Sequence, residues 1–290
     1  MFYRYMKIFY LLTLMLLSSF WLVAQESETT ARSSIDTNAI KEVRSFRELG
    51  GIGIGAISFR DMATSPLIYR GSAFSFRSSK TKISANYESK FGIDFLVGAA
   101  FSSVAKENSL GFMINTDIGY TGLFTLRSLS FKGWQSKVGG SLSILFVNRL
   151  NPDLRNNSVG FEFFPTLFGS FKIAKDFTRH LPLRKKKGPR DQHFSFRLDV
   201  GLINANFRNG YAYTTHSPFY NGSDLFENHQ LNVFSGFRIR SVVDYILYAK
   251  TTKNAVKISY NWAGVLSGEN PDRFTMSSGL VSFSYLYRIK

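Results

Sequence analysis

The chain has 290 residues, a formal net charge of +16 and no cysteine, and it contains 29 Phe, 14 Tyr and 23 Gly but only 7 Pro. The missing cysteine excludes a disulfide framework, a thiolate metal site, a cysteine nucleophile and a lipid anchor attached to cysteine. A composition rich in aromatic residues and glycine is typical of strands with an apolar outer face.

The first 24 residues have the three parts of a secretory signal peptide. Arg4 and Lys7 make the start positive, an apolar run follows from Ile8 to Val23, and the chain turns polar after Ala24. This run is shorter than the roughly 20 residues that a spanning helix needs. We therefore expect cleavage after Ala24 rather than a permanent anchor. An exported protein does not meet nucleic acid, so we expect no nucleic-acid partner despite the basic charge.

Residues 25–49 are polar, rich in Ser, Thr and Glu, and without sustained alternation. We expect a periplasmic tail here, with a short helix around Ile40 to Phe46. From residue 50 to residue 290 the pattern changes to segments that alternate between apolar and polar residues and are separated by turn residues. This part is predicted to be one domain.

The alternating segments predict strands, because successive side chains of a strand point to opposite faces. Phe194, Phe196 and Leu198, for example, alternate with Arg197 and Asp199. No later segment is apolar over the length of a spanning helix, so a membrane would be crossed by strands. Ten strands are expected: Gly50–Phe59, Ile68–Ser79, Lys82–Phe101, Leu110–Phe124, Lys137–Arg149, Val159–Phe177, His193–Arg208, Leu231–Lys250, Asn254–Leu266 and Phe274–Ile289.

The predicted fold class is all-β, a single antiparallel transmembrane β-barrel of about ten strands. Eight or twelve strands remain open, because the segment 82–101 has room for an extra turn near Glu88. A soluble β-sandwich also alternates, but its strands usually run about 5–6 residues, shorter than these. With ten strands, the longest connection, 209–230, faces outside, as expected for an extracellular loop. The connections 128–136 and 178–192 are longer than periplasmic turns usually are.

The chain resembles a known family in its apolar leader ending in Ala24-Gln25, its polar tail and its Gly-rich strands up to the terminal segment Phe283 to Arg288. It is similar to the small outer-membrane β-barrel proteins of Bacteroidota-type bacteria. Many proteobacterial barrels end in Phe, whereas this chain ends in Lys290. The resemblance implies insertion by the barrel assembly machinery, and it implies no particular activity.

The first candidate site is the predicted lumen, where charged residues lie on the polar faces of three consecutive strands: Arg197, Asp199, Arg238, Arg240, Asp244 and Lys257. Asp94, Glu162 and Lys172 are expected to join them from earlier strands. Charges inside a narrow barrel are costly unless they are paired. The favoured interpretation is a structural network of salt bridges, and the alternative is a small pore whose cations prefer anions.

The second candidate site is a basic loop that would contact lipid head groups or other anions: Arg184, Lys185, Lys186, Lys187 and Arg190. Each Lys or Arg near an anionic surface contributes about 1 kcal/mol. A solvated turn explains the same residues equally well. The basic charge of the whole chain is expected to match lipid head groups, with lipopolysaccharide phosphates as a further candidate.

The third candidate site is the long loop, whose extracellular contact residues would be Tyr211, Tyr213, Phe219 and Tyr220. The same loop holds Asp224, Glu227 and His229, which can form an acid–base pair with His229 as the base. Their spacing matches no hydrolase motif known for outer-membrane barrels, so a chance cluster is favoured.

Two further segments have plainer interpretations. The segment from Asp61 to Tyr69 is predicted to be a loop that ends one strand and starts the next, because Ser65-Pro66 favours an extended turn. The glycines between Gly50 and Gly55 are predicted to be strand glycines near a barrel seam.

The sequence therefore predicts an exported outer-membrane barrel of a Gram-negative bacterium with a non-enzymatic structural or binding role and a largely filled lumen. We expect no catalytic residues, no metal and no cofactor. The predicted partners are outer-membrane lipid and, during insertion, the assembly machinery. The ligand and any protein partner are not specified by the sequence. The alternatives are a narrow, anion-preferring passive channel and a rim hydrolase acting on lipid or peptide.

Overall fold

The computed structural model describes residues 44–84, 86–104, 107–131, 133–157, 159–179, 190–209, 229–249, 254–268 and 273–289. The predicted signal peptide, most of the polar tail, most of the basic loop and most of the long loop lie outside these residues. The described residues contain no helix that is both long enough and apolar enough to cross a membrane.

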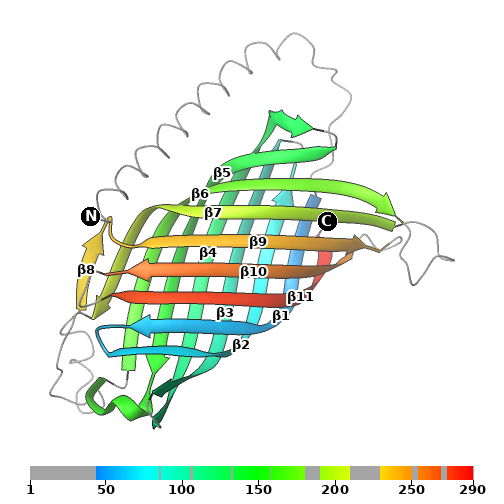
Figure 1. Cartoon of the computed structure of the whole chain (residues 1–290). Coiled ribbons are helices and arrows are strands. Elements are labelled where there is room, and N and C mark those ends of the chain that lie inside the picture. The colour runs from blue at the N-terminus through cyan, green and yellow to red at the C-terminus, as the bar shows by residue number, and fades with distance from the viewer. Residues whose placement is uncertain are drawn as a thin grey trace. The chain divides into compact units, whose positions relative to one another are not determined.

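The strands form one closed antiparallel sheet (Figure 1). Strands that are consecutive in sequence pair with each other, except that β8 and β9 both pair with β7, and the pairing of β1 with β11 closes the ring. The strands are β1 (Arg44–Asp61), β2 (Ser65–Ile83), β3 (Tyr87–Val104), β4 (Glu107–Phe131), β5 (Trp134–Leu150), β6 (Val159–Arg179), β7 (Arg190–Asn209), β8 (His229–Val233), β9 (Phe237–Tyr248), β10 (Ala255–Ser267) and β11 (Phe274–Ile289). A 3₁₀ helix, η1 (Pro152–Asn157), lies between β5 and β6.

The short strand β8 and the strand β9 are two parts of one barrel strand, because both pair with β7. A bulge at residues 234–236 separates them, and it holds Phe234 and Gly236 at positive φ angles of 58° and 85°. The barrel therefore has ten strands, which confirms the predicted fold class and strand count. Each of the ten predicted segments overlaps one barrel strand.

The strands extend beyond their predicted ends at several places; β2, for example, runs from Ser65 to Ile83, so part of the loop predicted from Asp61 to Tyr69 is strand. β1 begins at Arg44, so residues 44–49 belong to the barrel, and the helix expected up to Phe46 does not form over residues 44–46. Most of the expected long connection 128–136 is instead strand, since β4 runs to Phe131 and β5 begins at Trp134. A register shift after Leu126 hides the alternation there, and the Ser130 hydroxyl donates to the Leu126 carbonyl at 2.8 Å within it.

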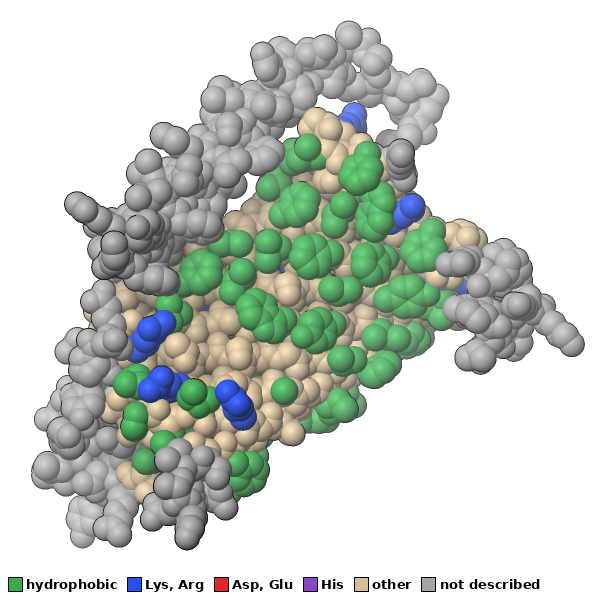
Figure 2. All heavy atoms as spheres, viewed as in Figure 1, with side chains coloured by type: hydrophobic (Ala, Val, Ile, Leu, Met, Phe, Trp, Pro, Cys, Tyr) green, Lys and Arg blue, Asp and Glu red, His purple; other side chains and the backbone are tan. Residues whose placement is uncertain are grey.

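The outer face of the barrel is apolar. Figure 2 shows apolar side chains covering the middle of this face, with Lys and Arg toward its ends. Ile54, Phe124 and Phe283 are 67%, 60% and 58% exposed. Tyrosines with hydrogen-bonded hydroxyls lie near one end of the strands, where Tyr87 and Tyr120 contact each other at 3.1 Å. This arrangement of apolar middle and amphipathic aromatic edge is typical of a lipid-facing surface.

Two glycines explain how the seam between β1 and β11 closes. A Cβ atom on Gly55 would lie 2.0 Å from the Gly279 carbonyl oxygen, so only glycine fits this close approach. Gly50, at φ +65°, is part of a bulge after which the inward face changes from even to odd residues. The predicted role of these glycines near a seam is confirmed by the pairing of β1 with β11.

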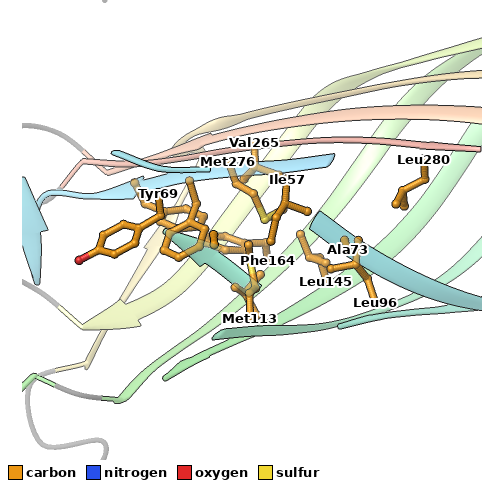
Figure 3. Close-up of a cluster of buried hydrophobic side chains, with 14 residues drawn as sticks. Ile57, Tyr69, Ala73, Leu96, Met113, Leu145, Phe164, Val265, Met276 and Leu280 are labelled. Atoms are coloured by element: carbon orange, nitrogen blue, oxygen red, sulfur yellow. The ribbon is translucent and has the colours of Figure 1, made fainter. Parts of the chain in front are cut away.

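The buried apolar core lies inside the barrel, on the inward faces of the strands (Figure 3). We call it the apolar plug; its residues are Ile57, Phe59, Tyr69, Ala73, Leu96, Ala100, Met113, Leu145, Val147, Phe164, Val265, Phe274, Met276 and Leu280. A barrel of this size is only slightly wider than one that side chains fill completely, so inward side chains can meet across it.

Candidate functional site

The candidate functional site is the barrel interior, which changes in character along the barrel axis. We call the end where β1 begins and β11 ends the termini end, and the end where β1 finishes at Asp61 the loop end. From the loop end inward, an ionic layer is followed by the apolar plug and then by a polar cavity that extends to the termini end.

The ionic layer at the loop end consists of two arginines and two acids that meet across the lumen. Arg149 donates to Asp61 at 2.6 Å and is paired with Glu162, and Arg208 donates to Asp61 at 2.7 Å. All four side chains are buried, and Glu162 is 0% exposed. The two positive and two negative charges balance, as buried charges must if the cost of removing them from water is to be offset.

The apolar plug is held together by stacked aromatic rings. Phe59 and Tyr69 stack with ring centroids 5.0 Å apart, and Phe164 and Phe274 stack at 5.9 Å. The Arg149 guanidinium lies 4.9 Å from the Phe274 ring centroid, which joins the plug to the ionic layer. The Tyr69 hydroxyl has a polar partner at the edge of the plug, because it accepts a hydrogen bond from Asn151 at 2.7 Å.

The polar cavity has a volume of about 190 Å³. The apolar plug forms the deep wall of the cavity, where Leu96, Leu145 and Met276 are among the lining residues. At the other end, the lining reaches Phe46 and Tyr248 near the termini end. The Phe46 and Tyr248 rings lie 6.2 Å apart at that end. A ligand would therefore enter from the termini end and stop at the plug.

The middle of the cavity is strongly charged. Its lining cations are Arg77, Lys90, Lys172, Arg197, Arg238, Arg240 and Lys257, and its lining carboxylates are Glu48, Glu88, Asp94, Asp117 and Asp244. One further cation and one further carboxylate, Lys137 and Asp199, pair with this set. Among the described residues, eight cations thus face six carboxylates, an excess of two positive charges.

Most of these charges are paired across the lumen or between neighbouring strands. Arg77 forms a bidentate pair with Asp94, at 2.5 and 2.8 Å. Lys137 and Lys172 both donate to the Glu88 carboxylate at 2.6 Å. Charge-assisted and bidentate pairs of this kind are among the strongest hydrogen bonds in proteins.

Two arginines of β9 reach across the lumen to Asp117 of β4. Arg238 and Arg240 approach its carboxylate at 3.1 and 3.3 Å, and Arg240 also lies 3.1 Å from Asp199. Both guanidinium groups lie over the Phe168 ring, at 5.2 and 4.3 Å from its centroid.

The structure places the six predicted lumen residues together around this cavity. Arg197 and Asp199 are 3.4 Å apart, and the Lys257 ammonium group forms an ion pair with Glu48 at 2.6 Å. Asp244 accepts a hydrogen bond from Ser259 at 2.5 Å. Of the three residues expected to join them, Asp94 and Lys172 line the cavity, while Glu162 lies in the ionic layer beyond the plug.

The other predicted sites fall largely outside the described residues. Of the basic loop, Arg190 begins β7, and residues 184–187 are not described. The four aromatic contact residues of the long loop and the acids Asp224 and Glu227 are not described either. His229 begins β8. Among the described residues there is no group of three or more His, Asp or Glu that could hold a metal ion.

Sequence reasoning missed several residues of the interior. Asp61 was expected in a loop, but it is the buried last residue of β1 and the centre of the ionic layer. Its position two residues after Phe59 places both side chains on the inward face, a signal that the period-2 rule contains. Glu48 was expected in the polar tail and is instead a buried partner of Lys257.

Comparisons with known proteins give structural similarity only. No protein-family model matches the chain, and no curated protein matches it. The transport unit of the autotransporter AIDA-I from Escherichia coli has a TM-score of 0.42 and 9% identity, over 88% of this chain and 93% of that one. The translocator domain of the autotransporter NalP from Neisseria meningitidis has a TM-score of 0.29 and 8% identity, over 92% and 97%.

A further similar structure comes from Pseudomonas aeruginosa. Pseudomonas aeruginosa OpdL has a TM-score of 0.15 and 9% identity, over 86% of this chain and 99% of that one. All of these TM-scores are below 0.5. The function of the barrel therefore has to be inferred from its own residues.

Proposed function

We propose that this chain is an integral protein of the outer membrane of a Gram-negative bacterium. Its role is structural or ligand-binding rather than enzymatic, and its lumen does not conduct. The observation that carries the proposal is the division of the barrel into an apolar outer face and a lumen closed by buried side chains. The narrower assignment to barrels of the Bacteroidota type stays a prediction from the leader and the strand pattern.

Lipid contact is supported by the outer face. Large apolar side chains such as Ile54 and Phe283 are more than half exposed on it, and a soluble monomer rarely exposes so continuous an apolar surface. In a membrane the same side chains contact acyl chains. A closed sheet also leaves no unpaired strand edge, which lipid would not tolerate.

Cations at both rims of the outer face support contact with anionic head groups. At the loop end, Arg70 and Arg273 are exposed, and at the termini end, Arg47, Lys80 and Lys82 are exposed. Lys and Arg near an anionic membrane surface are each stabilised by about 1 kcal/mol. We propose that these residues contact lipid phosphates, with lipopolysaccharide as the candidate on the outer leaflet.

A filled lumen is favoured over a passive channel by the apolar plug and the ionic layer. An ion moving along the axis would have to leave the polar cavity, cross a region lined by Phe164, Phe274 and Met113, and break the pairs of Asp61. Entering an apolar region without hydration is costly for any ion. We propose that ions reach the cavity from the termini end and do not pass the plug.

The proposal is tested by fractionation and conductance on the same protein. We expect the mature chain in purified outer membranes, with the heat-modifiable mobility of a folded barrel, and a closed trace when it is inserted in planar bilayers. Recovery in soluble periplasmic extract would contradict the membrane assignment. Steady conductance would contradict the filled lumen, and a hydrolase activity that is lost in His229→Ala would contradict the non-enzymatic role.

A further inference from the structure

Two cations of the polar cavity, Lys90 and Arg197, form ion pairs but no hydrogen bond with the described residues. The carboxylate of Glu48 lies 4.0 Å from the Lys90 Nζ atom, at the outer limit of an ion pair, and it also lies 2.6 Å from Lys257. Asp94 and Asp244 attract the Lys90 ammonium group from farther away. Arg197 has only Asp199 near it, 3.4 Å from its Nε atom, and this Nε is buried without a hydrogen-bond partner among the described residues.

The positive charges of these two side chains repel each other. Arg197, Arg77 and Lys257 all lie close enough to Lys90 to repel its ammonium group. Lys90 and Arg197 are 23% and 17% exposed in their side chains, so they have little water to compensate. A buried cation with only a long ion pair keeps part of the cost of its removal from water, and a bound anion would offset that cost for both cations at once.

The volume and the charge of the cavity limit what that anion can be. One water needs about 10–15 Å³ of such space, so 190 Å³ is room for a small ligand with some of its waters. An excess of two positive charges matches a phosphate group, which carries about −1.5 to −2 at pH 7. The planar fork of an arginine binds phosphate oxygens in pairs, and a lysine binds them as a point charge.

We propose that the polar cavity is a binding site for a small phosphate-bearing anion that enters from the termini end, with Lys90 and Arg197 as its direct ligands. The apolar plug ends the path, so the anion is held and not conducted. This inference rests on the proposed function, since an open pore would let the anion pass.

The test is equilibrium dialysis of radiolabelled inorganic phosphate against the full chain folded in phosphate-free detergent micelles. We expect saturable binding of one phosphate per chain. Lys90→Met and Arg197→Gln should each weaken it about tenfold or more, since each removes a charge-assisted contact. Both variants remove a cation whose ion pair is long, and the carboxylate left behind keeps a closer cation, Lys257 for Glu48 and Arg240 for Asp199, so they should keep the heat-modifiable barrel. Lys90→Arg should retain binding, and the exposed Arg127→Gln is the matched control that should not change it.

A second arm identifies the source of the phosphate. Micelles doped with phosphatidic acid, whose head group is a phosphomonoester, should displace the label if the ligand is a lipid head group, and should leave it bound if the ligand is a free phosphate. The inference is overturned if the folded wild type shows no saturable binding, or if both variants bind as the wild type does; the cavity then holds water only. A closed barrel without phosphate binding overturns this inference alone, whereas a conducting barrel overturns the proposed function.

Discussion

Arg149 donates to Asp61 across the lumen at 2.6 Å, although β5 and β1 are not neighbouring strands. The Asp61 carboxylate also accepts a hydrogen bond from Arg208 of β7, so it connects three strands of the barrel, β1, β5 and β7. Such a contact exists only when the barrel is closed. It explains why a small barrel can use charged residues for filling its interior without losing stability.

Removing the carboxylate of Asp61 should strongly destabilise the barrel. In Asp61→Asn, Arg149 and Arg208 stay buried with one less negative charge, and breaking a buried pair in this way costs about 3–5 kcal/mol. Urea unfolding in lipid vesicles measures the change. The control is Asp153→Asn in the exposed η1, where the side chain accepts a hydrogen bond from the Leu110 amide and the amide oxygen can still accept it. Equal stability of both variants would contradict the role of the ionic layer.

The stacked rings of the apolar plug should contribute a similar amount to the free energy of unfolding. Phe274 is 0% exposed and touches both Phe164 and the Arg149 guanidinium. Phe274→Ala leaves a cavity and is expected to lower the free energy of unfolding by about 3–5 kcal/mol. Phe274→Leu keeps most of the volume and should cost clearly less. If both substitutions are tolerated equally in urea unfolding, the plug is not tightly packed.

Arginine substitutions on the outer face show whether that face contacts lipid or water. Ile114 is 42% exposed and pairs with Val97 near the middle of β3, and Leu129 is 42% exposed near the termini end of β4. In a membrane, Ile114→Arg should cost about 2–4 kcal/mol and Leu129→Arg about 0–1 kcal/mol, because the cost falls from the bilayer middle to its edge. On a soluble protein both substitutions are harmless. Unfolding in vesicles gives the two values, and no difference between them would argue against a lipid-facing surface.

The predicted strands and the side each charge faces depend only on local alternation, and this is why they could be predicted. Arg238 and Arg240 follow the period of β9 and point inward as expected. Bulges defeat the same rule. After Gly50 the inward face changes parity, so that Glu48 and Gly51 both face the lumen.

The partners inside the lumen could not be predicted from the sequence. Arg149 and Asp61 are separated by 88 positions, and nothing in either strand indicates that barrel closure brings them together. The apolar plug was missed for another reason. Alternation assigns Phe164 to one face of β6 and Phe274 to one face of β11. It does not show whether that face lines the lumen or forms the outer surface of the barrel.

The close approach at the seam gives a test of barrel closure. A methyl group in Gly55→Ala would meet the Gly279 carbonyl oxygen at 2.0 Å, so β1 and β11 would have to move apart. We expect a loss of about 1–3 kcal/mol, as for other overpacked sites. Gly140→Ala is the control, because its nearest neighbour, the Phe168 carbonyl oxygen, is 3.5 Å away. Slower or incomplete folding of Gly55→Ala in detergent, seen by heat-modifiable mobility, would agree with this expectation.

The direct test of the division between lipid-facing and lumen-facing side chains uses single cysteines, since the natural chain has none. Val281 points outward and is 42% exposed, whereas Ser278 on the same strand lines the cavity. A nitroxide label is attached at each position, and its relaxation is measured in vesicles with oxygen and with a water-soluble nickel complex. We predict high oxygen and low nickel accessibility at 281, and low oxygen accessibility at 278. A label at 281 that is accessible to nickel and not to oxygen would show a water-facing surface and contradict the account.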